Sequence, residues 1–77
     1  MSAVRAYQVA PGVYALASED EAGQYRAPMT EEARELTGAS AVFGSARDIA
    51  ASPNVTKYAS AAAAKAALQE WLDEGGA

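Results

Sequence analysis

The chain has 77 residues, 21 of them Ala, so it forms one small domain with few large side chains for a core and with marginal stability. The absence of Cys and His excludes disulfides, thiolate metal sites, and the commonest catalytic bases and nucleophilic pairs. The net charge of −4 argues against direct binding to nucleic acid or to an anionic membrane, because both require clustered Lys and Arg.

The first part of the chain has the pattern of a β-meander. Two runs of β-branched and aromatic residues, 4–9 and 13–18, flank Ala10-Pro11-Gly12, and this predicts a β-hairpin because Pro presets the turn and Gly supplies positive φ. An acidic turn over residues 19–24 leads into a third short strand at 25–27, which Pro28 ends. The side chains that we place on the core side of the hairpin are Tyr7, Val9, Tyr14 and Leu16.

A short helix is predicted over residues 30–37. Thr30 is a good N-cap, acidic residues in the first turn favour the helix dipole, and Gly38 is a natural residue to follow the last turn. Met29, Ala33 and Leu36 fall on one face, which we expect to pack against the sheet.

The next segment, residues 39–44, fits either a short strand or the lead into a helix, and we favour the strand. Ser45-Ala46-Arg47-Asp48 has the form of a capping box and predicts a helical turn through Ala51. Residues 55–58 are expected to form a final short strand.

The C-terminal helix is the segment that the sequence predicts most directly. It covers residues 60–74, with Ser60 as its N-cap and two glycines after it. Leu68, Trp71 and Leu72 are expected to cover the hairpin at the bulky end of its apolar face. The fold class is therefore α+β: one domain over residues 1–77, with a small antiparallel β-meander sheet packed against the C-terminal α-helix and two short additional helices. The apolar face of the helix over residues 60–74 also includes Ala61, Ala64 and Ala67.

Few side chains here carry chemistry. Phe43-Gly44-Ser45 before a helix is a weak sign of a phosphate site, and a connecting turn explains it better. Two carboxylates such as Asp20 and Glu31 could act as acid and base only in a pocket, for which we expect little room. The acidic turn lacks the alternating ligand spacing of an EF-hand loop. We therefore expect no enzyme activity, no metal site and no cofactor.

The carboxylates form clusters that are candidates for partner binding. The last cluster lies at a helix C-terminus, where the dipole disfavours each anion by about 0.3–1 kcal/mol. Solubility alone also explains such charge, and the alternative is a negative surface made for a partner. The clustered residues are Glu19, Asp20 and Glu21; Glu31, Glu32 and Glu35; and Glu70, Asp73 and Glu74.

Helical carboxylates four residues apart, such as Glu31 and Glu35, have Cβ atoms about 5–6 Å apart, a spacing comparable to neighbouring phosphates of a nucleic-acid strand. In size, acidic clusters and α+β layout, the chain resembles small phage or mobile-element inhibitors of the anti-CRISPR type. That resemblance implies a non-enzymatic inhibitor that acts as a DNA mimic on a protein with a basic surface, such as a CRISPR effector or another nucleic-acid-binding complex.

The sequence also predicts where the protein acts. The chain has no apolar run of the length of a signal peptide or a membrane span, so we expect a cytoplasmic protein, in the host cell if a phage encodes it.

The alternative function is a small structural or assembly subunit that oligomerises through apolar surface. Its interface would use aromatic side chains instead of carboxylates, and the protein is a monomer or a small homo-oligomer. The aromatic candidates are Tyr7, Tyr14, Tyr25 and Trp71.

Overall fold

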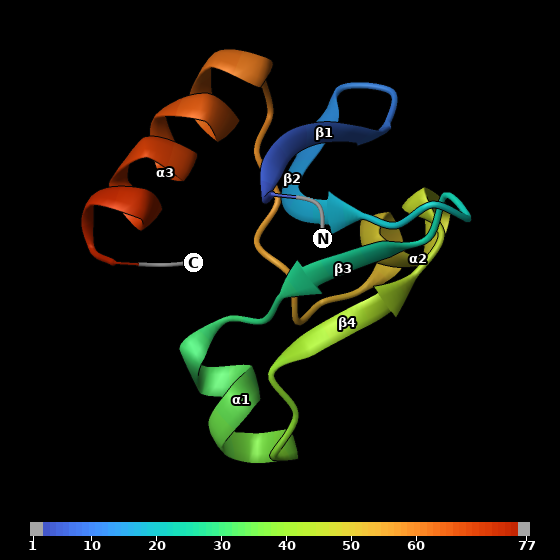
Figure 1. Cartoon of the computed structure of the whole chain (residues 1–77), viewed down its shortest axis with the longest axis vertical. Helices are drawn as coiled ribbons and strands as arrows, with labels where there is room; N and C mark the ends of the chain where they lie inside the picture. Colours follow the sequence, from blue (N-terminus) through green and yellow to red (C-terminus); the bar gives the residue numbers. More distant parts are fainter. Residues whose placement is uncertain (1–2, 76–77) are drawn as a thin grey trace.

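A computed structural model describes residues 3–75 of the chain (Figure 1). It confirms the α+β prediction: a four-stranded antiparallel sheet in the order β1-β2-β3-β4 is accompanied by a C-terminal helix and two shorter helices. No helix within residues 3–75 has the length and apolar character needed to cross a membrane. The elements are β1 Arg5–Ala10, β2 Val13–Glu19, β3 Tyr25–Pro28, α1 Glu31–Thr37, β4 Ala41–Gly44, α2 Ala46–Ala51 and α3 Ala61–Asp73.

The sheet consists of two hairpins joined over a short distance. β1 pairs with most of β2, and β3 pairs with β4 along its whole length. β2 and β3 share only two residue pairs, Ser18 with Arg26 and Glu19 with Tyr25. The two hairpins therefore diverge away from this junction, which leaves the middle of the sheet open.

Tyr58 fills part of that opening. Its backbone exchanges hydrogen bonds of 2.8 and 2.9 Å with Tyr14 of β2. The expected strand at 55–58 is thus wrong, because this contact is an isolated bridge. Lys57 provides the physical reason, since its ammonium group donates to the backbone carbonyls of Ser52 and Val55 and holds the segment as a compact loop. Burial lowers the pKa of the Lys57 ammonium group below its usual value.

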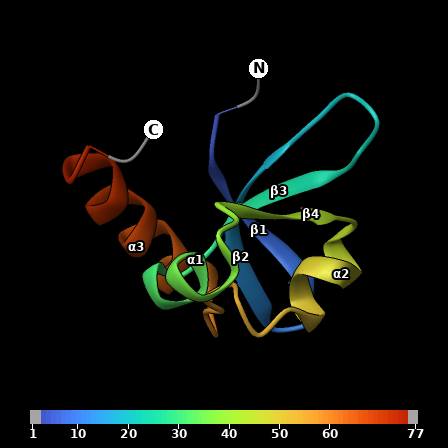
Figure 2. The ribbon, with the colours of Figure 1, turned by 90° about the horizontal axis from the view of Figure 1, so that it is seen from below.

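Helices α2 and α3 lie on opposite sides of the β1–β2 hairpin (Figure 2). The α2 side holds the core, in which Ile49 is the largest fully buried side chain. The remaining buried members of that cluster are small or β-branched: Val9, Ala15, Ala17, Ala27 and Val55. A core of such small side chains lets the sheet and the helix approach closely, but it buries little apolar volume.

The core face of β2 differs from the prediction. Tyr7 of β1 pairs with Ala15 of β2, and directly paired residues share a face of the sheet. Ala15 is fully buried on the core side, so Tyr14 and Leu16 project toward the α3 side, where they are half-buried. The prediction failed because residues 13–17 of β2 are apolar at every position, so that alternation along the strand did not identify the core face.

The three helix N-caps are confirmed. The side-chain oxygens of Thr30, Ser45 and Ser60 accept the backbone N–H three residues ahead at 3.2, 3.2 and 3.1 Å. Each cap satisfies one donor that the first turn of a helix leaves unpaired.

The predicted inner face of α1 is partly wrong. Ala33 is buried as expected, but the side chain of Leu36 is 87% exposed. Thr37 is also exposed, and its hydroxyl donates to the carbonyl of Ala33 at 2.8 Å and contacts the sulfur of Met29. The reason is that α1 makes few contacts with the strands or the other helices, so most of its side chains, including Leu36, stay in solvent.

Helix α3 contacts β1 and β2, and Ala64 in its alanine-rich half is fully buried. Further along, Leu68 and Trp71 are half-buried, and Leu72 is 49% exposed. The expectation that Leu72 covers the hairpin is therefore wrong. The small side chains allow close contact at the start of the helix, and the bulky residues after them hold its end away from the sheet.

Candidate functional site

The α3 side of the sheet is uncovered over β3 and β4. Phe43 of β4 lies on this uncovered part, and its side chain is 69% exposed. Arg26 of β3 pairs directly with Phe43, and its guanidinium carbon lies 5.8 Å from the centroid of the ring. This distance falls within the range of a cation–π contact. The exposed ring therefore already holds one cation, supplied by the neighbouring strand.

An open cleft of about 1390 Å³ extends from these two residues to the last turns of α3. Trp71 and Leu72 of α3 line it, as does Val4, just before β1. The cleft is open to solvent along its length, so it is a surface groove and does not contradict the expectation of little room for an enclosed ligand pocket. The cleft exists because α3 departs from the sheet and the two hairpins diverge.

The acidic turn closes the other end of the cleft. Asp20 organises this turn, because its Oδ1 atom accepts the backbone N–H groups of Ala22 and Gln24, both at 2.9 Å. The backbone N–H of Asp20 donates to the carbonyl of Gln24 at 2.9 Å, and Gly23 has φ of 79°. Asp20 is thus committed to the turn, and Glu19 and Glu21 are also among the residues that line the cleft.

Tyr25 connects the acidic turn to the core. Its ring stands edge-on to that of Tyr7, with centroids 5.1 Å apart and an interplanar angle of 71°. Burial raises the pKa of the Tyr25 phenol, and the negative charge of Glu19 and the neighbouring Tyr7 raise it further. Tyr25 therefore stays protonated and supports the turn as a structural residue.

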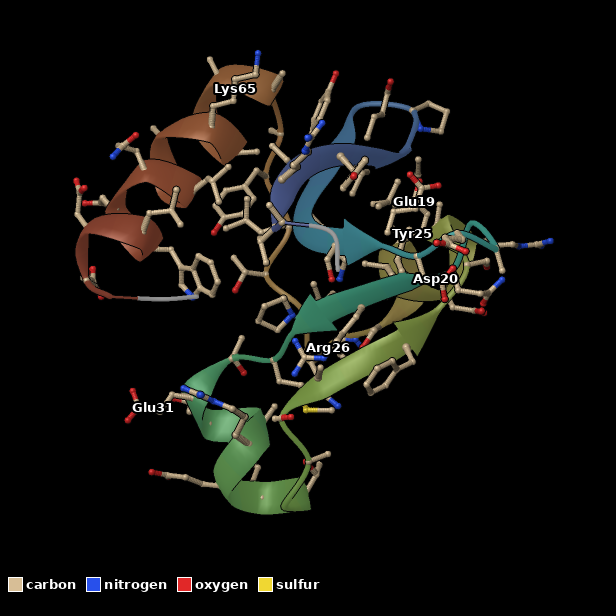
Figure 3. The ribbon with its side chains drawn as sticks, viewed as in Figure 1. Glu19, Asp20, Tyr25, Arg26, Glu31 and Lys65 are labelled. Carbon is tan, nitrogen blue, oxygen red and sulfur yellow. The ribbon has the colours of Figure 1, made fainter. Side chains whose placement is uncertain are left out.

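The other two acidic clusters lie elsewhere. The acidic turn projects from one side of the molecule, away from α1 and from the end of α3, in both ribbon views (Figures 1 and 2). Glu31, labelled on α1, is likewise far from Glu19 and Asp20 in Figure 3. The three clusters therefore do not form one continuous surface. Of the nine residues, only Glu19 is half-buried, and the other eight are exposed.

Local contacts account for part of this charge. Glu31 and Glu32 lie in the first turn of α1, where the dipole favours them. Asp73 accepts a hydrogen bond of 2.9 Å from the side-chain amide of Gln69, one turn earlier in α3. Glu35, Glu70 and Glu74 have exposed side chains.

The turn at Phe43-Gly44-Ser45 is a helix start and offers no anion site. The carboxylate of Asp48 accepts the backbone N–H of Ser45 at 3.0 Å, completing the capping box. Hydrogen bonds from the backbone and hydroxyl of Ser45 hold the pKa of Asp48 below its usual value. The N-terminus of α2 is thus occupied by the chain's own anion.

The aromatic residues of the assembly alternative are mostly engaged within the chain. Tyr7 and Tyr25 pack on each other, and Tyr14 is half-buried beside the Tyr58 bridge. Trp71 is half-buried and borders both the cleft and a small hollow of about 120 Å³ beside Leu16. Of this set, Tyr25 and Trp71 line the cleft, and Tyr25 is also packed against Tyr7.

Sequence reasoning missed Arg26, Phe43 and Leu72 as site residues. The predictive signal was weak: Phe43 is the one Phe of the chain, in a four-residue strand with apolar neighbours, and nothing local told which face it takes. No group of three or more residues able to hold a metal ion is found among residues 3–75. The cleft offers apolar, aromatic and acidic contacts.

Comparison of the chain with protein-family models, curated proteins and solved structures finds no significant match. The likeness to anti-CRISPR inhibitors accordingly depends on size, charge and layout alone.

Proposed function

We propose that the chain is a non-enzymatic protein-binding protein that holds a basic partner, and that it acts in the cytoplasm. The observation that carries the proposal is the cleft, which joins the exposed apolar side chains of Phe43 and Leu72 to a carboxylate-bearing turn. Apolar anchors beside a charged rim are the usual composition of a protein-binding surface. An apolar cleft left open in so small a protein also favours a partner that covers it.

The specific form that we propose is an inhibitor that prevents a nucleic-acid-binding complex from holding its target, as anti-CRISPR proteins do. Its support is the net charge of −4 and the exposure of eight of the nine clustered carboxylates. Because the clusters lie on different sides of the molecule, they act mainly by orienting the protein toward a basic groove. The cleft then supplies the close contact.

The test begins by identifying the complex through affinity purification and mass spectrometry, followed by a native gel shift with that complex and its labelled DNA. We expect the protein to abolish the shifted DNA band, and to do so less effectively as salt rises. The matched variant replaces six carboxylates by their amides and should lose most inhibition. These six are Glu31, Glu32, Glu35, Glu70, Asp73 and Glu74. Unchanged inhibition by the six-residue variant would contradict the proposal.

The assembly alternative has one observation in its favour. Leu36, Phe43 and Leu72 are large apolar side chains that are left exposed and are available to a second copy. Light scattering separates the two functions: an oligomer that persists at high salt supports assembly, and a monomer at all salt concentrations supports the proposed inhibitor.

A further inference from the structure

The cleft has a chemical preference that follows from its own lining. Three carboxylates and one guanidinium group line it, so a cationic ligand is favoured over an anionic one. Of the three, Asp20 is held by the turn, which leaves Glu19 and Glu21 to meet an incoming charge. A phosphate or an acidic peptide would face these carboxylates with only Arg26 to offset them.

The contact between Arg26 and Phe43 shows which cation suits the ring. A guanidinium group lies 5.8 Å from the ring centroid on the wall of the cleft. Arg stacks on an aromatic face through its planar group, whereas the ammonium of Lys is compact and more strongly hydrated. Arg26 therefore occupies, in the free protein, the kind of position that an arginine from outside would take.

The apolar side chains in the cleft favour a ligand that carries apolar groups as well as a positive charge. Leu72 is 49% exposed, and Trp71 and Val4 lie beside it. An arginine alone would leave these surfaces in water, whereas an apolar side chain next to it in the ligand would cover them. A second copy of this chain is disfavoured as the occupant, because each copy carries a net charge of −4.

On this basis, and resting on the proposed function, we infer that the cleft binds an extended protein segment in which arginine alternates with apolar residues. Phe43 and Leu72 anchor the segment, Glu19 and Glu21 receive its positive charge, and Arg26 competes with it for the ring of Phe43. Arg26 thus weakens binding, although it lines the site.

The probe is a fluorescein-labelled octapeptide of alternating Arg and Leu, and fluorescence anisotropy measures its binding to the protein. Emission of Trp71, the only Trp of the chain, gives a second readout from within the cleft. Peptides of Arg with Ser and of Glu with Leu test the two requirements, and we expect each to bind at least about tenfold more weakly. A peptide of Lys with Leu should bind about two- to fivefold more weakly than the Arg peptide.

Variants assign the binding to the cleft. Phe43→Ser should weaken binding of the Arg–Leu peptide by about tenfold, as loss of a central anchor does. Arg26→Gln should strengthen it by about two- to fivefold, the range for one exposed charge interaction. Leu36→Ser, which removes an exposed apolar side chain on α1, is the control and should leave binding unchanged. Should Phe43→Ser perturb the fold, Phe43→Leu serves instead and should remove the preference for Arg over Lys.

The inference is overturned if the Arg–Leu peptide binds more weakly to the Arg26→Gln variant, or equally well to the Phe43→Ser variant. It is also overturned if the Glu–Leu peptide binds more tightly than the Arg–Leu peptide, or if the mass of the protein measured by light scattering doubles without peptide. The gel shift keeps this inference separate from the proposed function. If Phe43→Ser inhibits the complex as well as the unaltered protein does, the cleft does not bind the partner, and only the inhibition through the exposed carboxylates remains supported. If the peptide binds as expected and no nucleic-acid complex is inhibited, the function is wrong and the cleft stands.

Discussion

Arg26 and Phe43 are paired across β3 and β4, and the guanidinium group of one lies 5.8 Å from the ring centroid of the other. Both side chains stand on the face of β3 and β4 that α3 leaves uncovered, opposite α2. The side chain of Arg26 shields part of the Phe43 ring, which is otherwise exposed. It also places one positive charge in a cleft whose other charged residues are acidic.

This contact should be measurable as a coupling between the two side chains. In a double-mutant cycle with Arg26→Gln and Phe43→Leu, we expect a coupling free energy of about 0.5–1 kcal/mol, the size of an exposed cation–π contact. Urea unfolding of the four proteins gives the value. The cycle of Arg34→Gln with Leu36→Ala is the control and should be additive, because residues two apart on a helix do not face each other. Additivity at both pairs would show that the Arg26–Phe43 contact contributes nothing.

Ile49 should dominate the stability of the fold, because it is the largest fully buried side chain in a core made mostly of Ala. Ile49→Ala is expected to lower the free energy of unfolding by about 2–5 kcal/mol. A domain of this size has about 4–12 kcal/mol in total, so the loss is a large part of it. Urea denaturation followed by circular dichroism measures the change. Leu36→Ala removes a similar side chain that is 87% exposed and should cost less than about 0.5 kcal/mol. Equal losses in the two variants would contradict this assignment of the core.

Gly44 should be intolerant of any side chain. Its φ is 153°, and a Cβ atom there would lie 2.6 Å from Oδ2 and 2.8 Å from Cβ of Asp48. Gly44→Ala is therefore expected to disrupt the capping box of α2 and to destabilise the protein by more than about 1 kcal/mol. Thermal unfolding provides the comparison with Gly12→Ala, where φ is 70° but no atom lies within 4 Å of the new Cβ. Gly12→Ala bears only the backbone cost, so a smaller loss at Gly44 than at Gly12 would refute the steric argument.

Asp48 should make stability depend on acid pH. Its pKa is lowered in the folded protein from the usual 3.8, chiefly by the backbone N–H of Ser45. The stabilisation is therefore complete above pH 3.8 and is lost as pH falls through the lower pKa of the folded state. Urea titrations from about pH 5 to about pH 2 should show a fall in stability that is smaller in Asp48→Ala. Glu32→Ala, which alters an exposed carboxylate of α1, is the control and should retain the fall. The same pH dependence in Asp48→Ala would exclude the capping box as its source.

The sequence by itself determined the helix starts and the first hairpin turn. Thr30, Ser45 and Ser60 each bond to a backbone N–H three residues ahead, so the interaction needs no distant part of the chain. Gly12, with φ of 70°, allows the turn between β1 and β2 for an equally local reason. The alanine content also predicted correctly that the core would hold few large side chains.

Only the tertiary structure decided which side chains those elements bury. The pairing of Tyr7 with Ala15 turned Tyr14 and Leu16 away from the core, and the departure of α3 from the sheet left Leu72 and Phe43 exposed around the cleft. Hydrogen bonds within one turn depend on residues three or four apart, which a sequence displays directly. Strand register and helix docking depend on contacts between distant segments, and a shift of one residue reverses every side chain of a strand.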